Sequence, residues 1–262
     1  MYNIIKKFIQ HGVVTVDYPK KPIKTDFITG RPEVDIKTCM KCGECVKRCP
    51  SGAVIMREAP AFNIDECIFC SLCADICPKG AITMTHKFEL SAMSREELRS
   101  SPITIEERNI PSDDYEIIGM RLKENIGRYF GRSLQIREID AGSCNGCDNE
   151  INALNSPFND IERFGVHFVA SPRHADMLLV TGTATRNMEL ALIKTYNATP
   201  DPKLVVAVGA CACSGGIFKD SYSTRNGIDC ILPVDVYIPG CPPRPQSLIY
   251  GIMIAIERIR KV

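Results

Sequence analysis

The sequence lacks an excess of charge of either sign, and it lacks a long hydrophobic run. Its 32 basic residues are offset by 31 acidic ones, for a net charge of +1, so no electrostatic affinity for nucleic acid is expected. No apolar run approaches the roughly 20 residues that a membrane-spanning helix needs. The longest candidate, SLIYGIMIAIERIR (247–260), is soon interrupted by charge and predicts a buried or half-buried helix.

Targeting signals are also missing from the first residues. MYNIIKKFIQHGVV has neither the apolar core and cleavage site of a secretory signal nor a twin-arginine signal. We therefore expect a cytoplasmic protein, a setting in which disulfides are rare. Fourteen cysteines in such a protein favour metal binding over a disulfide framework.

What the sequence does contain is a cysteine-rich segment repeated at an offset of 28 residues. CMKCGECVKRCPSGAVIM (39–56) and CIFCSLCADICPKGAITM (67–84) share all four cysteines and the Pro, Gly, Ala and Met that follow. Each copy is C-x2-C-x2-C-x3-C-P, the run of a bacterial two-cluster ferredoxin, whose fourth cysteine binds the other cluster. The alternative, a pair of zinc knuckles, has no use for a third cysteine in each run. We expect one 4Fe–4S cluster on Cys39, Cys42, Cys45 and Cys77, and a second on Cys67, Cys70, Cys73 and Cys49.

This region, roughly residues 30–86, resembles the ferredoxin-like subunits of membrane-bound hydrogenases and of respiratory complex I. The polar segment SREELRSSPITIEERNIPSDD (94–114) predicts a connector with a short helix at its start. YEIIGMRLKENIGRYFG (115–131) has apolar residues at helical spacing. It predicts a helix that either covers the domain edge or docks on a partner subunit or at the membrane surface.

From residue 134 onward, short apolar runs alternate with helical segments. We predict strands at LQIREID, VHFVA, ADMLLVTG, KLVVAVGA and VDVYIPG, and helices at DNEINALN, NMELALIKTYN and PQSLIYGIMIAIERIR. This alternation predicts an α/β fold, with a parallel sheet covered by helices on both faces. We therefore expect the chain to have four parts. These are an N-terminal extension (1–30), an α+β two-cluster ferredoxin-like domain (31–86), a linker and docking helix (87–132) and a flavodoxin-like parallel-sheet domain (133–262).

In parallel α/β sheets, ligands lie at the loops that leave the carboxyl ends of the strands. GSCNGC, GACACSGG and PGCPP all fall there. The Cys144 and Cys147 pair alone suits a redox disulfide, half of a zinc site or half of an iron–sulfur site. A redox disulfide needs no cysteine from the other two loops. A structural zinc site remains an alternative, because four cysteines are also the number of ligands that zinc requires. The ferredoxin-like domain favours a third cluster, to which its own clusters would deliver electrons.

Four segments carry a second resemblance, which covers about residues 121–262. GSCNGCDNE, SPRHADMLLVTG, VVAVGACACSGG and VDVYIPGCPPRP are similar to the small subunit of energy-converting nickel–iron hydrogenases, including formate hydrogenlyase, and to the complex I subunit that carries the terminal cluster. The resemblance implies a proximal 4Fe–4S cluster on Cys144, Cys147, Cys211 and Cys241. The residues alone do not favour Cys211 over Cys213. Cys213 and Cys230 are expected to be small buried residues.

The two kinds of relative differ at the first ligand pair. The complex I subunit has adjacent cysteines, whereas the hydrogenase subunit has Cys-x-x-Cys, as in CNGC here. A hydrogenase subunit is therefore favoured, and a subunit of a quinone or sulfane-sulfur reductase is the alternative. Twelve of the 14 cysteines are assigned, which leaves too few for a nickel–iron site. The resemblance thus places that centre in a partner large subunit.

The function implied is that of an oxidoreductase subunit that is not catalytic alone. It would relay electrons through three 4Fe–4S clusters to the nickel–iron centre, where protons become hydrogen. Expected partners are the large subunit, the membrane subunits of a complex I-like arm, and a soluble ferredoxin or a formate dehydrogenase module as donor. These partners would hold the chain on the inner face of the cell membrane.

Three polar residues near these motifs have more than one interpretation. Glu150 lies three residues after Cys147 and is either a proton relay, as the resemblance suggests, or a carboxylate that stabilises a helix start. Arg173 either neutralises cluster charge or pairs with Asp176. His174 is expected to be a surface residue, since no second ligand motif accompanies it.

Overall fold

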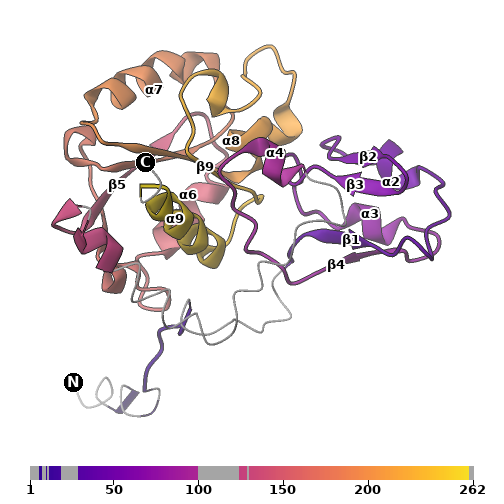
Figure 1. Cartoon of the computed structure of the whole chain (residues 1–262), viewed down its shortest axis with the longest axis horizontal. Coiled ribbons are helices and arrows are strands. Elements are labelled where there is room, and N and C mark those ends of the chain that lie inside the picture. Colours follow the sequence, from indigo (N-terminus) through magenta and orange to yellow (C-terminus); the bar gives the residue numbers. More distant parts are fainter. Residues whose placement is uncertain are drawn as a thin grey trace.

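The computed structural model describes residues 6–7, 10, 12–18, 29–99, 124–128 and 130–259. Two parts are visible within them, a cysteine-rich part built on antiparallel ribbons and a parallel-sheet domain beside it (Figure 1). The short helix α4 (Arg95–Leu98) lies between them. Its N-cap is Ser94, whose hydroxyl accepts a hydrogen bond from the Glu97 amide at 3.3 Å. The helix predicted at the start of the connector is therefore confirmed.

The cysteine-rich part repeats one local structure. In the first copy, helix α2 (Glu44–Lys47) precedes strand β2 (Val54–Met56), and in the second, helix α3 (Leu72–Asp75) precedes strand β4 (Ile82–Met84). The strands then pair in two antiparallel ribbons, β1 (Pro32–Val34) with β4 and β2 with β3 (Pro60–Phe62). The sequence repeat is thus also a structural repeat.

The chain enters and leaves the cysteine-rich part at one point. The Gly30 amide donates to the Thr85 carbonyl at 2.6 Å, and the Arg31 amide donates to the Lys87 carbonyl at 3.0 Å. A Cβ atom at position 30 would lie 2.1 Å from the Lys87 carbonyl oxygen. Glycine is therefore required for this close approach of the two ends.

The second part is a five-stranded, fully parallel sheet. Its strands are β5 (Leu134–Asp140), β6 (Val166–Phe168), β7 (Met177–Thr181), β8 (Leu204–Val208) and β9 (Val236–Ile238), and their order is β6-β5-β7-β8-β9. In chain order this is the 2-1-3-4-5 arrangement of the flavodoxin-like folds. The predicted fold class is confirmed.

The helices that follow strands of this sheet are α6 (Gly146–Ala153), α7 (Arg186–Ala198), α8 (Gly209–Ser214) and α9 (Pro245–Ile259). Short 3-10 turns, η1 (Ile161–Phe164), η2 (Pro172–His174), η3 (Gly216–Phe218) and η4 (Ile228–Cys230), complete the loops. Each strand and helix predicted from residue 134 onward corresponds to one of these strands or α-helices.

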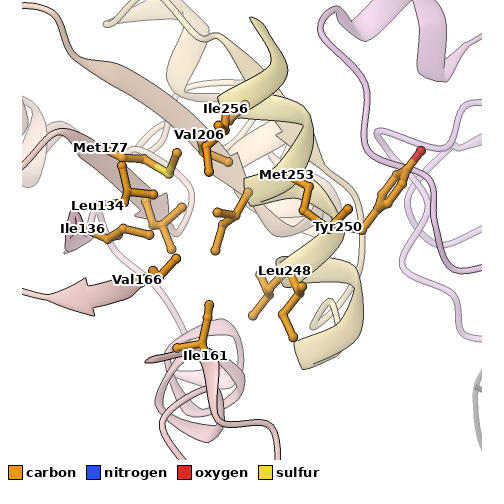
Figure 2. Packing of buried hydrophobic residues seen from close by; sticks show 14 of the residues in the cluster. Leu134, Ile136, Ile161, Val166, Met177, Val206, Leu248, Tyr250, Met253 and Ile256 are labelled. Atoms are coloured by element: carbon orange, nitrogen blue, oxygen red, sulfur yellow. The ribbon is translucent and has the colours of Figure 1, made fainter. Parts of the chain in front are cut away.

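Both faces of the sheet are buried, and alternate residues of each strand supply the two faces. Met177 and Leu179 of β7 join the apolar cluster on one face, while Leu178 and Val180 join the cluster on the other. The first face packs against α9, whose Leu248 and Ile256 point toward the strands (Figure 2). Within the described residues, no helix is both long and apolar enough to cross a bilayer.

The second face shares its core with the cysteine-rich part. Its cluster joins Val54 and Ile82 of the ribbons, Leu98 of the connector, and Leu178 and Val205 of the sheet. Because a shared apolar core is buried only when both parts are in place, we infer that the two parts stabilise each other.

An N-terminal arm, residues 12–18, packs on the sheet domain. The Val16 amide donates to the Phe158 carbonyl at 2.8 Å, and the Arg163 guanidinium donates to the carbonyls of Val16 and Tyr18. The Tyr18 side chain is only 2% exposed, and its hydroxyl donates to Glu89 at 2.9 Å. The arm therefore contributes to the core of the sheet domain and is more than an extension of the chain.

The helix predicted at 115–131 falls partly outside the described residues, which exclude 115–123 and 129. Residues 124–128 and 130 are helical. Ile126 is 2% exposed and belongs to the cluster beneath α9. For this portion, the structure supports the interpretation that the segment covers the domain edge.

Candidate metal centres

Four cysteines of the repeat line one cavity. They are Cys39, Cys42 and Cys45 from the first copy and Cys77 from the second, and we call them the first thiol group. Burial raises the pKa of Cys45, and the nearby thiols of Cys42 and Cys39 raise it further. The fourth cysteine of the second copy is thus beside the first three of the other copy, as the ferredoxin pattern predicts.

The first three cysteines of the second copy and the fourth cysteine of the first form a second thiol group, Cys49, Cys67, Cys70 and Cys73. Burial raises the pKa of Cys67 to about 12, and the other three thiols of the group contribute to this shift. Burial likewise raises the pKa of Cys73 to about 11, and the thiols of Cys70 and Cys49 add to the shift. Cys49 therefore lies with the cysteines of the second copy, although it belongs to the first in sequence.

The loops that carry these thiols have the same backbone shape in both copies. Lys41 and Phe69, at equivalent positions, have φ of 57° and 55°, and Gly43 and Ser71 have φ of 77° and 63°. Left-handed conformations are uncommon for residues other than glycine. Their recurrence indicates that the loop shape is imposed by the site, which is where such strain usually concentrates.

Backbone amides also point at two of the thiols. The Phe69 amide lies 3.4 Å from Cys67 Sγ, and the Ala81 amide lies 3.2 Å from Cys77 Sγ. Hydrogen bonds to ligand sulfur are one of the means by which a protein sets the reduction potential of a cluster.

A third thiol group forms at the carboxyl ends of the parallel strands. Cys144 and Cys147 lie between β5 and the first turn of α6, Cys211 lies in α8 after β8, and Cys241 follows β9. Burial raises the pKa of Cys147, and the thiols of Cys211, Cys241 and Cys144 all add to the shift. Burial raises the pKa of Cys211 to about 11, again with Cys241 and Cys144 as neighbours. The three loops therefore bring four thiols together.

Two glycines leave room for these sulfur atoms. A Cβ atom on Gly209 would lie 2.6 Å from Cys147 Sγ, and one on Gly146 would lie 3.5 Å from Cys144 Sγ. Gly209 also has φ of +86°, a backbone conformation that residues other than glycine rarely adopt. The space around the third thiol group thus depends on the absence of a side chain at residue 209.

The loop that holds Cys144 is fixed by a set of polar contacts. Asp140 accepts hydrogen bonds from the amides of Gly142 and Ser143 at 2.8 and 2.6 Å. The Ser143 hydroxyl donates to Asp148 at 2.6 Å, and the Thr181 hydroxyl of β7 donates to the same carboxylate at 3.0 Å. The loop is therefore bound to both of its flanking elements.

The residues present fit three iron–sulfur clusters. Each thiol group supplies four cysteines, the ligand number of a 4Fe–4S cluster, and all fourteen cysteines are free thiols. A redox-active pair instead requires a depressed thiol pKa, whereas that of Cys147 is raised. Among the described residues, no three His, Cys, Asp or Glu side chains are placed to hold a single metal ion.

The two remaining cysteines differ from each other. Cys213 is fully buried, with its sulfur 3.6 Å from the Ile238 carbonyl and 3.8 Å from the Ala207 carbonyl, as expected for a small core residue. Cys230 is exposed in η4, so the expectation that it is buried is wrong. It precedes a loop rather than a strand, because β9 begins only at Val236.

Of the three polar residues singled out in the sequence, the structure places only Glu150 near the thiols. Glu150 is half-buried and lines a cavity at the domain boundary together with Cys241 and Arg244. Burial raises its pKa, and Arg244 opposes the shift. Arg173 and His174 lie in η2, before β7, at the edge of the sheet opposite the thiols.

Asp176 does not pair with Arg173. Its carboxylate accepts hydrogen bonds from Arg132 at 2.7 and 2.9 Å. The interpretation of Arg173 as a partner of Asp176 is therefore wrong, and its position before β7 also removes it from the thiols. His174 is at the surface, as expected.

The second and third thiol groups meet across the domain boundary. Burial raises the pKa of Cys241, and the neighbouring thiols that add to the shift are Cys144 of its own group and Cys70 of the second group. Cys45 of the first group in turn affects Cys73 of the second. The three groups thus form a continuous series through the molecule.

Two family models match the two parts of the chain. Residues 31–82 match the 4Fe-4S dicluster domain, and residues 144–255 match the 20 kDa subunit of NADH ubiquinone oxidoreductase. Together with the thiol groups, they define a two-domain iron–sulfur oxidoreductase subunit that transfers electrons. The predicted ferredoxin-like domain is confirmed.

Individual relatives agree with this class. The probable membrane-bound hydrogenase subunit mbhJ of Pyrococcus furiosus is 49% identical over 146 residues, which are 54% of this chain and 87% of that protein. Formate hydrogenlyase subunit 7 of Escherichia coli is 48% identical over 52% of this chain and 53% of its own length. An NADH-quinone oxidoreductase subunit of Geobacter metallireducens is 52% identical over 44% of this chain and 67% of its own length. The chain belongs to the family of the 20 kDa subunit of NADH ubiquinone oxidoreductase, which it shares with these hydrogenase subunits.

Sequence reasoning missed the polar residues that support the sites. Glu138 of β5 and Asp148 of α6 interact beside Cys147, and a charged network links Asp65 to Arg95 at the domain boundary. Neither set has a characteristic spacing in the sequence. They come together only when distant segments pack.

Proposed function

We propose that the chain is the electron-transfer subunit of an energy-converting nickel–iron hydrogenase. Its three thiol groups would hold three 4Fe–4S clusters, and these supply one-electron chemistry when bound. The observation that carries the proposal is the continuous series of thiol groups, in which Cys45 neighbours Cys73 and Cys70 neighbours Cys241. Electrons would enter at the first thiol group and leave from the third, for proton reduction at a nickel–iron centre of a partner large subunit.

The residues of the chain would position and shield the clusters. The left-handed loops of the cysteine-rich part hold three thiols each, and Gly209 leaves space beside Cys147. Half-buried thiols exclude water from one side, and burial is one of the factors that tune a cluster's potential. Glu150, beside Cys241 in the boundary cavity, is proposed as a proton relay.

The proposed surroundings follow from the names of the relatives. The first of them is a membrane-bound hydrogenase subunit and the second belongs to formate hydrogenlyase. We therefore propose a nickel–iron large subunit and the membrane subunits of a complex I-like arm as partners, with a soluble ferredoxin or a formate dehydrogenase module as donor. Such partners would hold the chain at the inner face of the cell membrane.

A quinone oxidoreductase subunit is the second candidate, because the Geobacter relative is as similar as the hydrogenase subunits. The spacing of Cys144 and Cys147 supports the hydrogenase instead, since two intervening residues are typical of its small subunit and adjacent cysteines of the complex I subunit. A sulfane-sulfur reductase subunit is a further alternative, which the spacing of these two cysteines does not separate from a hydrogenase subunit. Two Cys-x-x-Cys pairs in the large subunit that copurifies with this chain would identify the hydrogenase.

Metal analysis tests the cluster assignment. Three 4Fe–4S clusters require about twelve irons per chain, with matching sulfide, and little zinc. Anaerobically purified protein is the material to measure. Stoichiometric zinc in the wild-type chain that is lost in a Cys241→Ser variant would show that the third thiol group holds zinc and not a cluster.

Two cysteine variants in the purified complex test the path that electrons take through the chain. Cys73→Ser removes a ligand of the second thiol group, so turnover driven by the physiological donor should fall while hydrogen–deuterium exchange, which needs no external electrons, persists. Cys147→Ser removes a ligand of the third group and should abolish both donor-driven and dye-driven hydrogen production. Subunit content is the control, because cluster binding and folding are coupled. Unchanged donor-driven turnover in Cys73→Ser would exclude the cysteine-rich part as the entry path.

A further inference from the structure

Charged side chains cross the boundary between the two domains, close to the second and third thiol groups. We call them the boundary charge network. It comprises Asp65 and Glu66 of the cysteine-rich part, Arg95 and Arg99 of the connector, and Lys219 and Asp229 of the sheet domain. Three acidic and three basic groups balance one another. The proposed function assigns no role to any of them.

Arg95 is the member that joins the two domains directly. Its Nε donates to Asp65 Oδ2 at 3.2 Å, and its Nη1 donates to Asp229 Oδ2 at 3.2 Å. The Arg95 side chain is 18% exposed and that of Asp65 is 0% exposed. A planar guanidinium offers donors in a fixed geometry, so the two carboxylates are held at a defined separation.

The other contacts strengthen the same junction. Arg99 donates to both carboxylate oxygens of Asp65, at 2.7 to 3.1 Å, and to Glu66 Oε1 at 3.0 Å. Lys219 reaches the same Glu66 oxygen at 2.9 Å. Buried ion pairs with several hydrogen bonds are far less tolerant of losing one partner than exposed pairs are. The junction is therefore expected to have one arrangement rather than several.

The network also lies directly beside the thiols. Asp65 and Glu66 immediately precede Cys67 of the second thiol group. The backbone carbonyl of Asp65 accepts a hydrogen bond at 2.8 Å from the Ser214 hydroxyl of α8, the helix that carries Cys211 of the third group. In Figure 1, α4 with Arg95 is drawn between the ribbons and α8. The segment before Cys67 and the helix with Cys211 are thus joined through one set of contacts.

We propose that Arg95 is a positioning residue that fixes the separation between the second and third thiol groups. The inference rests on the proposed function, because the separation matters only if both groups hold clusters. Electron transfer slows exponentially with distance, so a small shift at the boundary reduces the rate even when every cluster is intact. Loss of Arg95 leaves the buried Asp65 with Arg99 alone and breaks the direct link to Asp229.

The test measures the spin–spin interaction between clusters in the reduced full-length chain by electron paramagnetic resonance. Arg95→Gln should retain wild-type iron content but show an altered interaction, and intercluster electron equilibration should slow several-fold. Arg95→Lys keeps the charge and should restore part of the wild-type signal. The matched control is Arg132→Gln, which removes an arginine from a buried carboxylate, Asp176, at the opposite edge of the sheet. It should lower stability without altering the interaction.

Each outcome either supports the proposal or overturns it. A wild-type interaction in Arg95→Gln overturns the proposal, and so does an equal change in Arg132→Gln. If Arg95→Gln loses iron, Asp229→Ala takes its place, because it removes the sheet-domain partner of Arg95, and an unaltered interaction there overturns the proposal. If the wild-type chain itself holds no clusters, the proposed function fails, whatever Arg95 does.

Discussion

At the scale of single residues, the absence of a side chain is as important to the third thiol group as its four cysteines. Gly209 follows β8 with φ of +86°, and a Cβ atom there would lie 2.6 Å from Cys147 Sγ. Gly182 similarly allows the loop after β7 to approach Gly142, since its Cβ would lie 2.6 Å from the Gly142 carbonyl carbon. The third thiol group therefore depends on residues that are not themselves cysteines.

Gly209→Ala should prevent the third cluster from binding. The added methyl group would occupy the space of the Cys147 sulfur, so iron should fall by about four per chain while the other two clusters remain. Gly127→Ala is the matched control, because nothing lies within 4 Å of a Cβ atom there and alanine is favoured in a helix. Iron analysis of both variants checks this, and full iron in Gly209→Ala would contradict it.

A second residue-scale prediction concerns pH. Burial, reinforced by the neighbouring Asp148, raises the pKa of Glu138 to about 7 from its usual 4.5. Between pH 4.5 and about 7, Glu138 therefore carries a proton in the folded chain that it has already released in the unfolded chain. The stabilisation is complete below pH 4.5 and is lost as pH rises through about 7. Glu138→Gln removes the titration, so its melting temperature relative to wild type should rise between about pH 5.5 and pH 8. A difference that stays constant with pH would contradict the assignment.

At the scale of elements, the agreement between sequence and structure follows hydrophobic periodicity. LQIREID predicted a strand, and β5 spans the same seven residues. The choice of Cys211 over Cys213 could not be predicted from periodicity, because both lie in α8 and only their direction differs. Cys211 is half-buried among the thiols, whereas Cys213 is in the core. The Arg132–Asp176 pair could not be predicted from the sequence either, because it joins residues that are 44 positions apart.

The N-terminal arm gives a prediction at this scale. Tyr18→Ala should destabilise the sheet domain by about 3 kcal/mol, because it removes a buried aromatic ring from the core. Tyr18→Phe should cost only about 1 kcal/mol, through the hydrogen bond to Glu89. Val14→Ala is the control, since Val14 is 56% exposed. Denaturant titration followed by circular dichroism measures all three, and equal stability of Tyr18→Ala and wild type would show that the arm is dispensable.

At the scale of the whole molecule, the cysteines are divided among three groups of four and two that remain. Cys213 is in the core and Cys230 is exposed beside Asp229, so they do not form a further four-thiol site. The isolated chain should therefore neither bind nickel stoichiometrically nor produce hydrogen from a reduced dye. Nickel analysis and a dye-linked hydrogen assay on the purified chain check this. Hydrogen production by the chain alone would mean that it contains the catalytic centre.

The repeat itself illustrates what sequence can and cannot determine for the whole molecule. Its spacing predicted that Cys49 and Cys77 would exchange partners, and the structure places each beside the cysteines of the other copy. It gave no indication that the ribbons would share a core with the parallel sheet, because Val54 and Ile82 are as compatible with a separate small domain. Relative placement depends on contacts between distant segments, such as Arg95 with Asp229.

The meeting of Gly30 with Thr85 and of Arg31 with Lys87 has a consequence for how the chain can move. Tyr18 is anchored on the sheet domain before the cysteine-rich part begins, and Ala92 pairs with Tyr237 of β9 after it ends. In topology, the cysteine-rich part is an insertion with two covalent attachments to its host. A domain hung on one linker can rotate about it, but one attached at both ends loses most of that freedom. In isolation, this chain should therefore keep its two halves in a single relative orientation.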